Sequence, residues 1–254
     1  MGSGIIEPGL AWVRAGRGAN AAPIAALVSH PHHDHLLGFP FFKPAYREGW
    51  RIDIYGPKLC GREFGQILSR TMDAPYFPVA FSELKAEIRA ATFDPKLALV
   101  LEPGGKSLWL GAREAAPAGA VRVTAFHNPA HPKDGVMNYK LEYAGKTLVY
   151  CTDTEIAPRG SIPHLEFMRG ADLLIHDAQY TPAQYEEREE PRRGYGHSTY
   201  ITACAAAKKA KVKKLVLFHH DPEHTDAELK AIQRHAAKLF PGAALAKEGM
   251  VVTL

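Results

Sequence analysis

The segment His30–His35, which reads His-Pro-His-His-Asp-His, is the part of this chain that most constrains its fold. It follows the short apolar run Ile24–Val28, which predicts a buried strand that ends just before the first histidine. Side chains alternate along an extended segment, so His30 and His32 project to the same side and can share one metal ion. The fold must therefore hold this strand end where ligands from other parts of the chain can join it.

The donor atoms of this segment suit several metals. Imidazole nitrogen binds zinc, iron and other borderline cations, and the carboxylate of Asp34 adds a hard oxygen ligand. Asp34 and His35 lie beyond the extended part and are free to turn towards a second metal. A chance run of histidines is the alternative interpretation, and further ligands elsewhere in the chain would argue against it.

Three further strand-like runs lead to candidate ligands. Residues 121–126 lead to His127 and His131, residues 147–151 lead to Asp153, and residues 214–218 lead to His219 and His220. Together with the first segment, these strand ends supply enough ligands for two metals that share a carboxylate and a bridging water. We expect two divalent metal ions, with zinc first and manganese or iron as alternatives.

With these residues the chain resembles the metallo-β-lactamase superfamily, the binuclear metal hydrolases marked by the motif H-x-H-x-D-H. The match runs from about residue 4 to the C-terminus. His33 stands at the variable position of the motif, and His127 and His220 fit the family pattern less well than their neighbours. The resemblance implies one metal held by His30, His32 and His131, a second held by Asp34, His35 and His219, and a bridging Asp153.

Two other segments narrow the resemblance to one branch. Leu173–Ala178 and Gly196–Thr199 resemble the His-Glu-Ala-Thr and Gly-His-Ser-Thr segments of phosphodiesterases that include the transfer-RNA 3′-processing endoribonuclease, RNase Z. In that branch the acid and the histidines assist proton transfer and grip the phosphate. Asp177 stands where the branch has glutamate, so a loop or helix-cap residue is the alternative for this position. The resemblance implies catalytic roles for Asp34, His176, Asp177 and His197.

The connection between His131 and Asp153 departs from that branch. Bacterial members carry a long arm there that clamps transfer RNA. Here only a hairpin fits, with strands at Met137–Tyr143 and Lys146–Cys151 and a turn at Ala144–Gly145. Transfer-RNA maturation is therefore not expected, and a small phosphodiester or a short nucleic acid is the expected substrate.

Length and composition are those of one globular domain of residues 1–254. Of the 254 residues, 46% are hydrophobic and 23% are charged, and no run of eighteen apolar residues could form a membrane span. The net charge of +4 helps to attract phosphate but is too small for a dedicated nucleic-acid binder. Three cysteines cannot all pair and no secretory signal is recognisable, so we expect a cytoplasmic protein without a membrane partner.

Strand-like runs alternate with helix-like segments, which indicates an α/β architecture. Helices are expected at about Cys60–Thr71, from about Ser198, and from the capping box Thr225–Glu228. The resemblance implies a four-layer αβ/βα sandwich that lacks part of its N-terminal strands, because only 29 residues precede His30. The first sheet should then have an uncovered edge, which predicts a homo-oligomer.

A charged segment and two aromatic residues are further candidates for substrate contacts. Glu186–Arg193 mixes acidic and basic side chains and is expected to be a mobile surface segment, or a hinged flap over the site because Gly194–His197 follows directly. Tyr46 and Tyr76 lie in proline-bounded loops and are the aromatic residues that we expect to stack on a base.

The expected function is hydrolysis of a phosphodiester by a binuclear metal-dependent enzyme that uses a metal-bridging hydroxide. The same ligands would serve an acyl, thioester or lactone hydrolase, which is the first alternative. Iron in place of zinc would allow redox chemistry of sulfur or oxygen. A metal-stabilised scaffold that binds RNA or a protein without catalysis is the remaining alternative, and the complete set of ligand positions argues against it.

Overall fold

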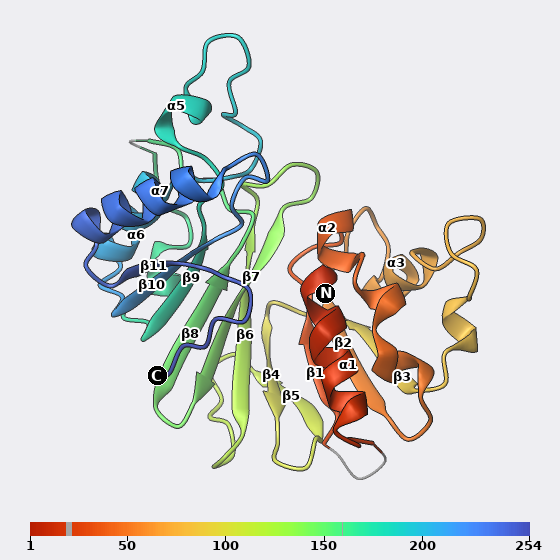
Figure 1. Cartoon of the computed structure of the whole chain (residues 1–254). Coiled ribbons are helices and arrows are strands. Elements are labelled where there is room, and N and C mark those ends of the chain that lie inside the picture. Colours follow the sequence, from red (N-terminus) through yellow and green to blue (C-terminus); the bar gives the residue numbers. More distant parts are fainter. Residues whose placement is uncertain (19–21, 159) are drawn as a thin grey trace. The chain divides into compact units, whose positions relative to one another are not determined.

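The computed structural model describes residues 1–18, 22–158 and 160–254. They form two compact units: unit 1 comprises Met1–Asp94 and Leu101–Trp109, and unit 2 comprises Pro95–Val100 and Leu110–Leu254. The expectation of one domain spanning residues 1–254 stays a prediction. Each unit contains helices and strands, which confirms the predicted α/β architecture (Figure 1). None of the helices within the described residues is long and apolar enough to cross a membrane.

Unit 1 is built on a parallel sheet in the order β1-β2-β3. Ile52 and Ile54 on the central strand are buried and pack with Phe64 and Leu68, which explains why this strand alternates apolar and polar residues. The strands are β1 (Ile24–Leu27), β2 (Arg51–Gly56) and β3 (Glu87–Thr92), and the α-helices are α1 (Ile6–Arg14), α2 (His33–Leu36) and α3 (Phe64–Arg70). Short 3-10 helices lie at Ser3–Ile5, Phe39–Phe41, Lys43–Tyr46 and Phe81–Glu83.

Two predictions for unit 1 need correction. β1 is a strand, but its residues are half-buried or exposed and not buried as predicted, because it lies at the edge of the sheet and pairs Ile24 with Ile52 of β2. Helix α3 begins at Phe64 and not at Cys60, because Cys60 and Gly61 have φ angles of 48° and 72°. Such angles belong to the left-handed region and cannot start a right-handed helix.

The sheet of unit 2 places four strand ends at one edge. Its strand order is β11-β10-β9-β8-β7-β6-β4-β5, and the residues of β4 and β5 run across the boundary between the units. β6 pairs with β7 and β7 pairs with β8 in the antiparallel sense, whereas β8, β9, β10 and β11 pair in the parallel sense. The C-terminal ends of β6, β8, β9 and β10 therefore lie at the same edge. The bounds are β4 (Leu97–Leu101), β5 (Ser107–Gly111), β6 (Val121–Asn128), β7 (Val136–Tyr143), β8 (Lys146–Cys151), β9 (Leu173–Asp177), β10 (Lys214–Phe218) and β11 (Ala243–Leu245).

The hairpin of β7 and β8 confirms the prediction for the chain between His131 and Asp153. Leu141 pairs with Leu148, and the turn residues Ala144 and Gly145 have φ angles of 47° and 73°. A glycine tolerates such an angle without steric cost, which explains why the turn falls there.

The helices of unit 2 begin where polar caps predict them. Thr199 and Thr225 each accept a hydrogen bond from the third residue of the following helix, so the predicted starts near Ser198 and at Thr225 are confirmed. Figure 1 shows α6 and α7 on the same side of the unit 2 sheet. Cys151 of β8 and Cys204 of α6 both lie in the hydrophobic core of unit 2, and burial raises the pKa of both thiols, as expected for packing residues. The helices are α4 (Leu165–Met168), α5 (Pro182–Tyr185), α6 (Tyr200–Lys209) and α7 (Asp226–Leu239).

Candidate metal centre

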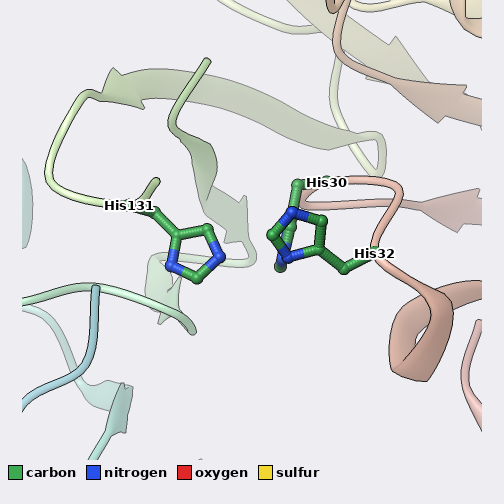
Figure 2. A group of neighbouring side chains, drawn as sticks. All are labelled: His30, His32 and His131. Carbon is green, nitrogen blue, oxygen red and sulfur yellow. The ribbon is translucent and has the colours of Figure 1, made fainter. Parts of the chain in front are cut away.

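In unit 1 the four predicted ligands lie together on the loop after β1. His30 is buried and its Nε2 lies 3.0 Å from Nδ1 of His32, with the ring centres 4.3 Å apart. Figure 2 shows these two rings side by side, and shows His131 of unit 2 on the loop after β6. The pairing of His30 with His32 agrees with the alternation of side chains in an extended segment.

The remaining two ligands of unit 1 lie where the chain turns into a helix. Helix α2 begins at His33, and within its first turn His35 Nε2 lies 3.0 Å from Asp34 Oδ2. The ring centre of His35 is 4.3 Å from that of His30, so the histidines form one cluster. His33 and the predicted ligand Asp34 are both exposed, so the expectation that His33 is not a ligand stays a prediction.

In unit 2 the predicted ligands after three strands, together with Asp177 and His197, form a second cluster. Ligand atoms of His131, Asp153 and His197 lie within 4.8 Å of one another, as do those of Asp177, His197 and His219. His219 Nε2 is 3.3 Å from Asp153 Oδ1, and the rings of His197 and His219 are stacked with centres 4.9 Å apart. The strand ends that share one edge of the sheet thus bring these side chains together.

Two members of this cluster have unusual backbone geometry. Asp153 follows β8 and His219 follows β10, with φ angles of 50° and 60°. Residues other than glycine rarely adopt the left-handed region, and aspartate and histidine are among those that tolerate it. Backbone conformations of this kind cost about 1–3 kcal/mol and cluster at functional sites, because the surrounding structure must hold them.

His131 is oriented by the backbone of a distant segment. Its Nδ1 lies 3.3 Å from the carbonyl oxygen of Gly196, which leaves Nε2 for a metal. Gly196 has a φ of 90°, and a Cβ atom there would lie 2.3 Å from Nδ1 of His131. A glycine is therefore required at residue 196 for this orientation of His131.

The alternative ligand His127 is exposed, and its Nε2 lies 2.6 Å from the carbonyl oxygen of Asp134.

The other alternative ligand, His220, faces away from the cluster. It lines a pocket of about 510 Å³ together with residues of α7, among them Leu229 and Gln233. Burial lowers the pKa of its imidazole, so that the neutral form is favoured. His219, and not His220, is the histidine that the strand end of β10 places beside Asp153.

Asp177 and His197 form a hydrogen-bonded pair. Asp177 is fully buried, and its Oδ2 lies 2.8 Å from Nδ1 of His197, while its Oδ1 accepts a hydrogen bond from the Ser198 N–H (2.8 Å). Asp177 therefore holds the start of the α6 segment, and it also orients an imidazole. The bond to Nδ1 leaves Nε2 of His197 for a ligand or a substrate.

His176 lies elsewhere, because neighbouring side chains of a strand point to opposite faces. Its ring is fully buried and stacks on His164, with the two Nε2 atoms 3.3 Å apart. Burial, together with the nearby His176, lowers the pKa of His164 to about 3. His164 was not found by sequence reasoning, because it lies in a loop without any periodic pattern.

Behind the strand ends lies a chain of fully buried polar side chains. Asn128 Nδ2 donates to Asn138 Oδ1 (3.2 Å), and Asn138 Nδ2 donates to Thr154 Oγ1 (3.1 Å). The Ser198 hydroxyl donates to the carbonyl oxygen of Thr154 (2.6 Å) and accepts from the Ile156 N–H (2.9 Å). This chain ties the loops after β6 and β8 to the start of the α6 segment. Sequence reasoning missed it, since isolated asparagines and hydroxyls have no spacing signature.

The chain matches known proteins in sequence. A family model described as a beta-lactamase superfamily domain matches residues 5–220. Ribonuclease Z of Treponema denticola is 30% identical over 267 residues, which cover 91% of this chain and 80% of that protein. Ribonuclease Z of Prochlorococcus marinus strain NATL1A is 35% identical over 260 residues, which cover 89% of this chain and 80% of that protein.

Solved structures show the same fold at lower identity. The metallo-beta-lactamase fold protein YhfI from Bacillus subtilis matches with a TM-score of 0.63 and 19% identity, and covers 98% of this chain and 83% of that chain. The short form of human tRNase Z matches with a TM-score of 0.52 and 20% identity, covering 90% of this chain and 78% of that chain. At such identities the likeness concerns the fold alone.

Proposed function

The chain belongs to the metallo-β-lactamase superfamily and is a metal-dependent hydrolase, and from this premise we propose that its substrate is a phosphodiester. The observation that carries the proposal is the Asp177–His197 pair, which sets an oriented imidazole beside His131 and His219. A phosphodiester presents non-bridging oxygens that such an imidazole can bind. The relatives named ribonuclease Z support the same class of reaction.

The proposed metal ligands come from both units. The fit of these residues to a metal ion is supported by close pairs of ligand atoms within each unit. His30 Nε2 lies 3.0 Å from His32 Nδ1, and His219 Nε2 lies 3.3 Å from Asp153 Oδ1. Nitrogen and oxygen donors favour zinc, and manganese or iron would also suit them. When bound, two divalent cations lower the pKa of a shared water to about 7 and so supply hydroxide at neutral pH. One metal would be held by His30, His32 and His131, the other by Asp34, His35 and His219, with Asp153 between them.

The protein's own groups would handle the charge and the proton. Asp177 keeps Nδ1 of His197 hydrogen-bonded, so an imidazolium at His197 would donate from Nε2 to an oxygen of the phosphate. This donation would stabilise negative charge that develops as the ester bond breaks. Asp34 lies beside His35 and would hold that histidine in place as well as bind metal. His176, which stacks on His164, would act only through its neighbour Asp177.

A small phosphodiester or a short nucleic acid is the proposed substrate. Support comes from the tight turn at Ala144 and Gly145, which leaves no arm between His131 and Asp153. Without an arm, the chain has nothing in that connection to clamp a folded RNA. A cytoplasmic location and self-association remain predictions, as does the four-layer arrangement of the two sheets.

A substrate panel tests the proposal. Metal-loaded protein is assayed on bis(p-nitrophenyl) phosphate, cyclic nucleotides, a lactone, a thioester and a β-lactam, with metal content measured on the same preparation. We expect hydrolysis of the phosphodiesters, and Asp153→Ala should abolish it and reduce the metal content. Hydrolysis of the carbonyl substrates alone would overturn the proposal in favour of an acyl hydrolase.

Two other outcomes would contradict it in different ways. Full metal content without hydrolysis of any substrate, together with salt-sensitive binding of RNA, would identify a binding scaffold. Iron as the bound metal, with its characteristic absorption, would point to redox chemistry. Retained phosphodiester hydrolysis in Asp153→Ala would show that the proposed ligand set is wrong.

A further inference from the structure

The segment between α5 and α6 is closed into a loop by one carboxylate. Glu155 accepts hydrogen bonds from the Tyr185 hydroxyl and from the N–H groups of Gly194 and Gly196, the latter two at 2.9 Å. Tyr185 precedes the segment and the two glycines end it, so both ends of the segment Glu186–Tyr195 are fastened to Glu155. Figure 1 shows this loop projecting from unit 2 after α5.

Charges within the loop are mostly paired, but one aromatic ring is open to solvent. Arg193 pairs with Glu186, and Arg192 pairs with Glu190. Tyr195 is 52% exposed, and the guanidinium of Arg192 lies 5.8 Å from the centre of its ring. The Tyr195 N–H donates to the Arg192 carbonyl oxygen (3.2 Å), which holds the two residues in one turn. The ring is thus positioned without being buried.

The loop connects this ring directly to the proposed phosphate contact. Tyr195 precedes His197 by two residues, so their backbones are at most about 7 Å apart. Between them, Gly196 holds His131 through its carbonyl oxygen. Tyr180 meets His197 edge-on, with ring centres 5.9 Å apart. The aromatic ring and the oriented imidazole therefore belong to one short segment of the chain, on either side of Gly196.

We propose that Tyr195 and Arg192 form a nucleobase-binding surface, which makes the substrate a nucleotide ester; this rests on the proposed phosphodiester hydrolysis. An aromatic face stacks on any base, and a guanidinium beside the ring adds a cation–π contribution. Tyr46 and Tyr76 stay predicted stacking residues: the Tyr46 hydroxyl donates to the Pro40 carbonyl oxygen, and Tyr76 is 85% exposed. Tyr195 differs from both in sharing a short segment with His197.

Binding of two phosphate monoesters tests this surface. Metal-loaded wild-type protein is titrated by calorimetry with thymidine 5′-monophosphate and with methyl phosphate, which differ only in the nucleoside. We expect the nucleotide to bind more tightly. Tyr195→Leu should weaken nucleotide binding about tenfold and leave methyl phosphate binding unchanged, since stacking on one base contributes roughly that much. Tyr195→Phe keeps the ring and should bind like the wild type.

Tyr143 provides a matched control, because it is 54% exposed and lies on the β7–β8 hairpin of the same unit. Tyr143→Leu should leave both affinities unchanged. The inference is overturned if the wild type binds both ligands equally, or if Tyr195→Leu changes neither affinity or both by the same factor. Hydrolysis of methyl p-nitrophenyl phosphate, measured separately on the wild type, reports on the proposed function alone. If the wild type hydrolyses this ester and Tyr195→Leu binds the nucleotide as tightly as the wild type, the proposed function stands and the nucleobase-binding surface is contradicted.

Discussion

The two ligand-bearing regions of the molecule are built in opposite ways. Unit 1 carries its four predicted ligands within the single segment His30–His35, where His30 lies beside His32 and Asp34 lies beside His35. Unit 2 draws its residues from four strand ends, spread from His131 to His219, and fastens them through fully buried polar groups. A contiguous motif is brought together by its own local backbone. A dispersed cluster depends on residues that never touch the metal or the substrate.

This contrast has an energetic basis. Each buried polar group of unit 2 must keep its hydrogen-bond partner, because leaving one unpaired costs about 1–3 kcal/mol. Asn138 Nδ2 donates to Thr154 Oγ1, and the Thr154 hydroxyl donates to the Thr152 carbonyl oxygen, so these contacts fix the loop after β8. We therefore expect variants behind the unit 2 cluster to change metal binding as well as stability.

The largest predicted effect tests whether ligands from the two units hold the same metal. His32→Ala removes a ligand from unit 1 and His131→Ala removes one from unit 2, and each should lower kcat/KM roughly a thousandfold, since a metal contributes several kcal/mol to the reaction. If both histidines hold the same metal, the double variant should be no worse than either single variant. Steady-state kinetics on bis(p-nitrophenyl) phosphate measures this. Multiplication of the two losses would mean that the regions act independently.

The next prediction sharpens the role of backbone support in unit 2. Gly196→Ala places a Cβ atom 2.3 Å from His131 Nδ1 and should lower metal affinity about 10–100-fold, as measured by competition with a chromophoric chelator. Gly194→Ala is the control, because its φ of 85° imposes similar backbone strain while its Cβ would meet nothing within 4 Å. Equal losses in both variants would show that backbone strain, and not the orientation of His131, is responsible.

A third prediction concerns pH and the buried pair of His164 and His176 in unit 2. His164 has a pKa lowered to about 3 by burial, whereas an unfolded histidine titrates near 6.5, so below pH 6.5 only the unfolded chain takes up this proton. The free energy of unfolding should therefore fall as pH drops from about 6.5 towards 3, by up to about 1.4 kcal/mol per pH unit for this group. His164→Gln removes the titration and should flatten the curve. Urea unfolding in chelator measures it, and parallel curves for the two proteins would contradict the prediction.

The smallest predicted effects are losses of unfolding free energy on replacing one buried serine in each unit. Ser198→Ala leaves the Thr154 carbonyl and the Ile156 N–H without this partner and should cost about 1–3 kcal/mol of unfolding free energy. Ser29→Ala loses one contact, to His30 Nδ1 (3.2 Å), and should cost about 1 kcal/mol or less. Denaturant unfolding gives both values. A larger loss for Ser29→Ala would reverse the proposed contrast between the units.

The same contrast explains what could be predicted from the sequence. His30–His35 was recognisable because chemistry, spacing and strand end coincide within a few residues, and the runs that end near Asp153 and His219 show the alternation of strands. The capping box at Thr225 gave a helix start that the structure confirms. These features depend on neighbours in sequence, and so they can be found without a structure.

Other features depend on contacts between distant segments. Glu155 meets Gly194 and Gly196 some forty residues later, and Asn128 reaches His164 across thirty-six positions. No local pattern marks such pairs, because the sheet creates them when it aligns its strand ends. The start of α3 was misplaced for a related reason, since the left-handed turn at its front is set by tertiary structure.

Metal content, determined by elemental analysis on wild type and Asp153→Ala after loading with zinc and gel filtration, tests the central claim most directly. The wild type should retain about two metal ions per chain, because seven side chains from both units supply nitrogen and oxygen donors for two sites. Asp153→Ala should retain fewer, since the proposed bridge between the two sites is lost. Wild-type protein that retains no metal, or a variant that retains as much as the wild type, would contradict the shared metal centre.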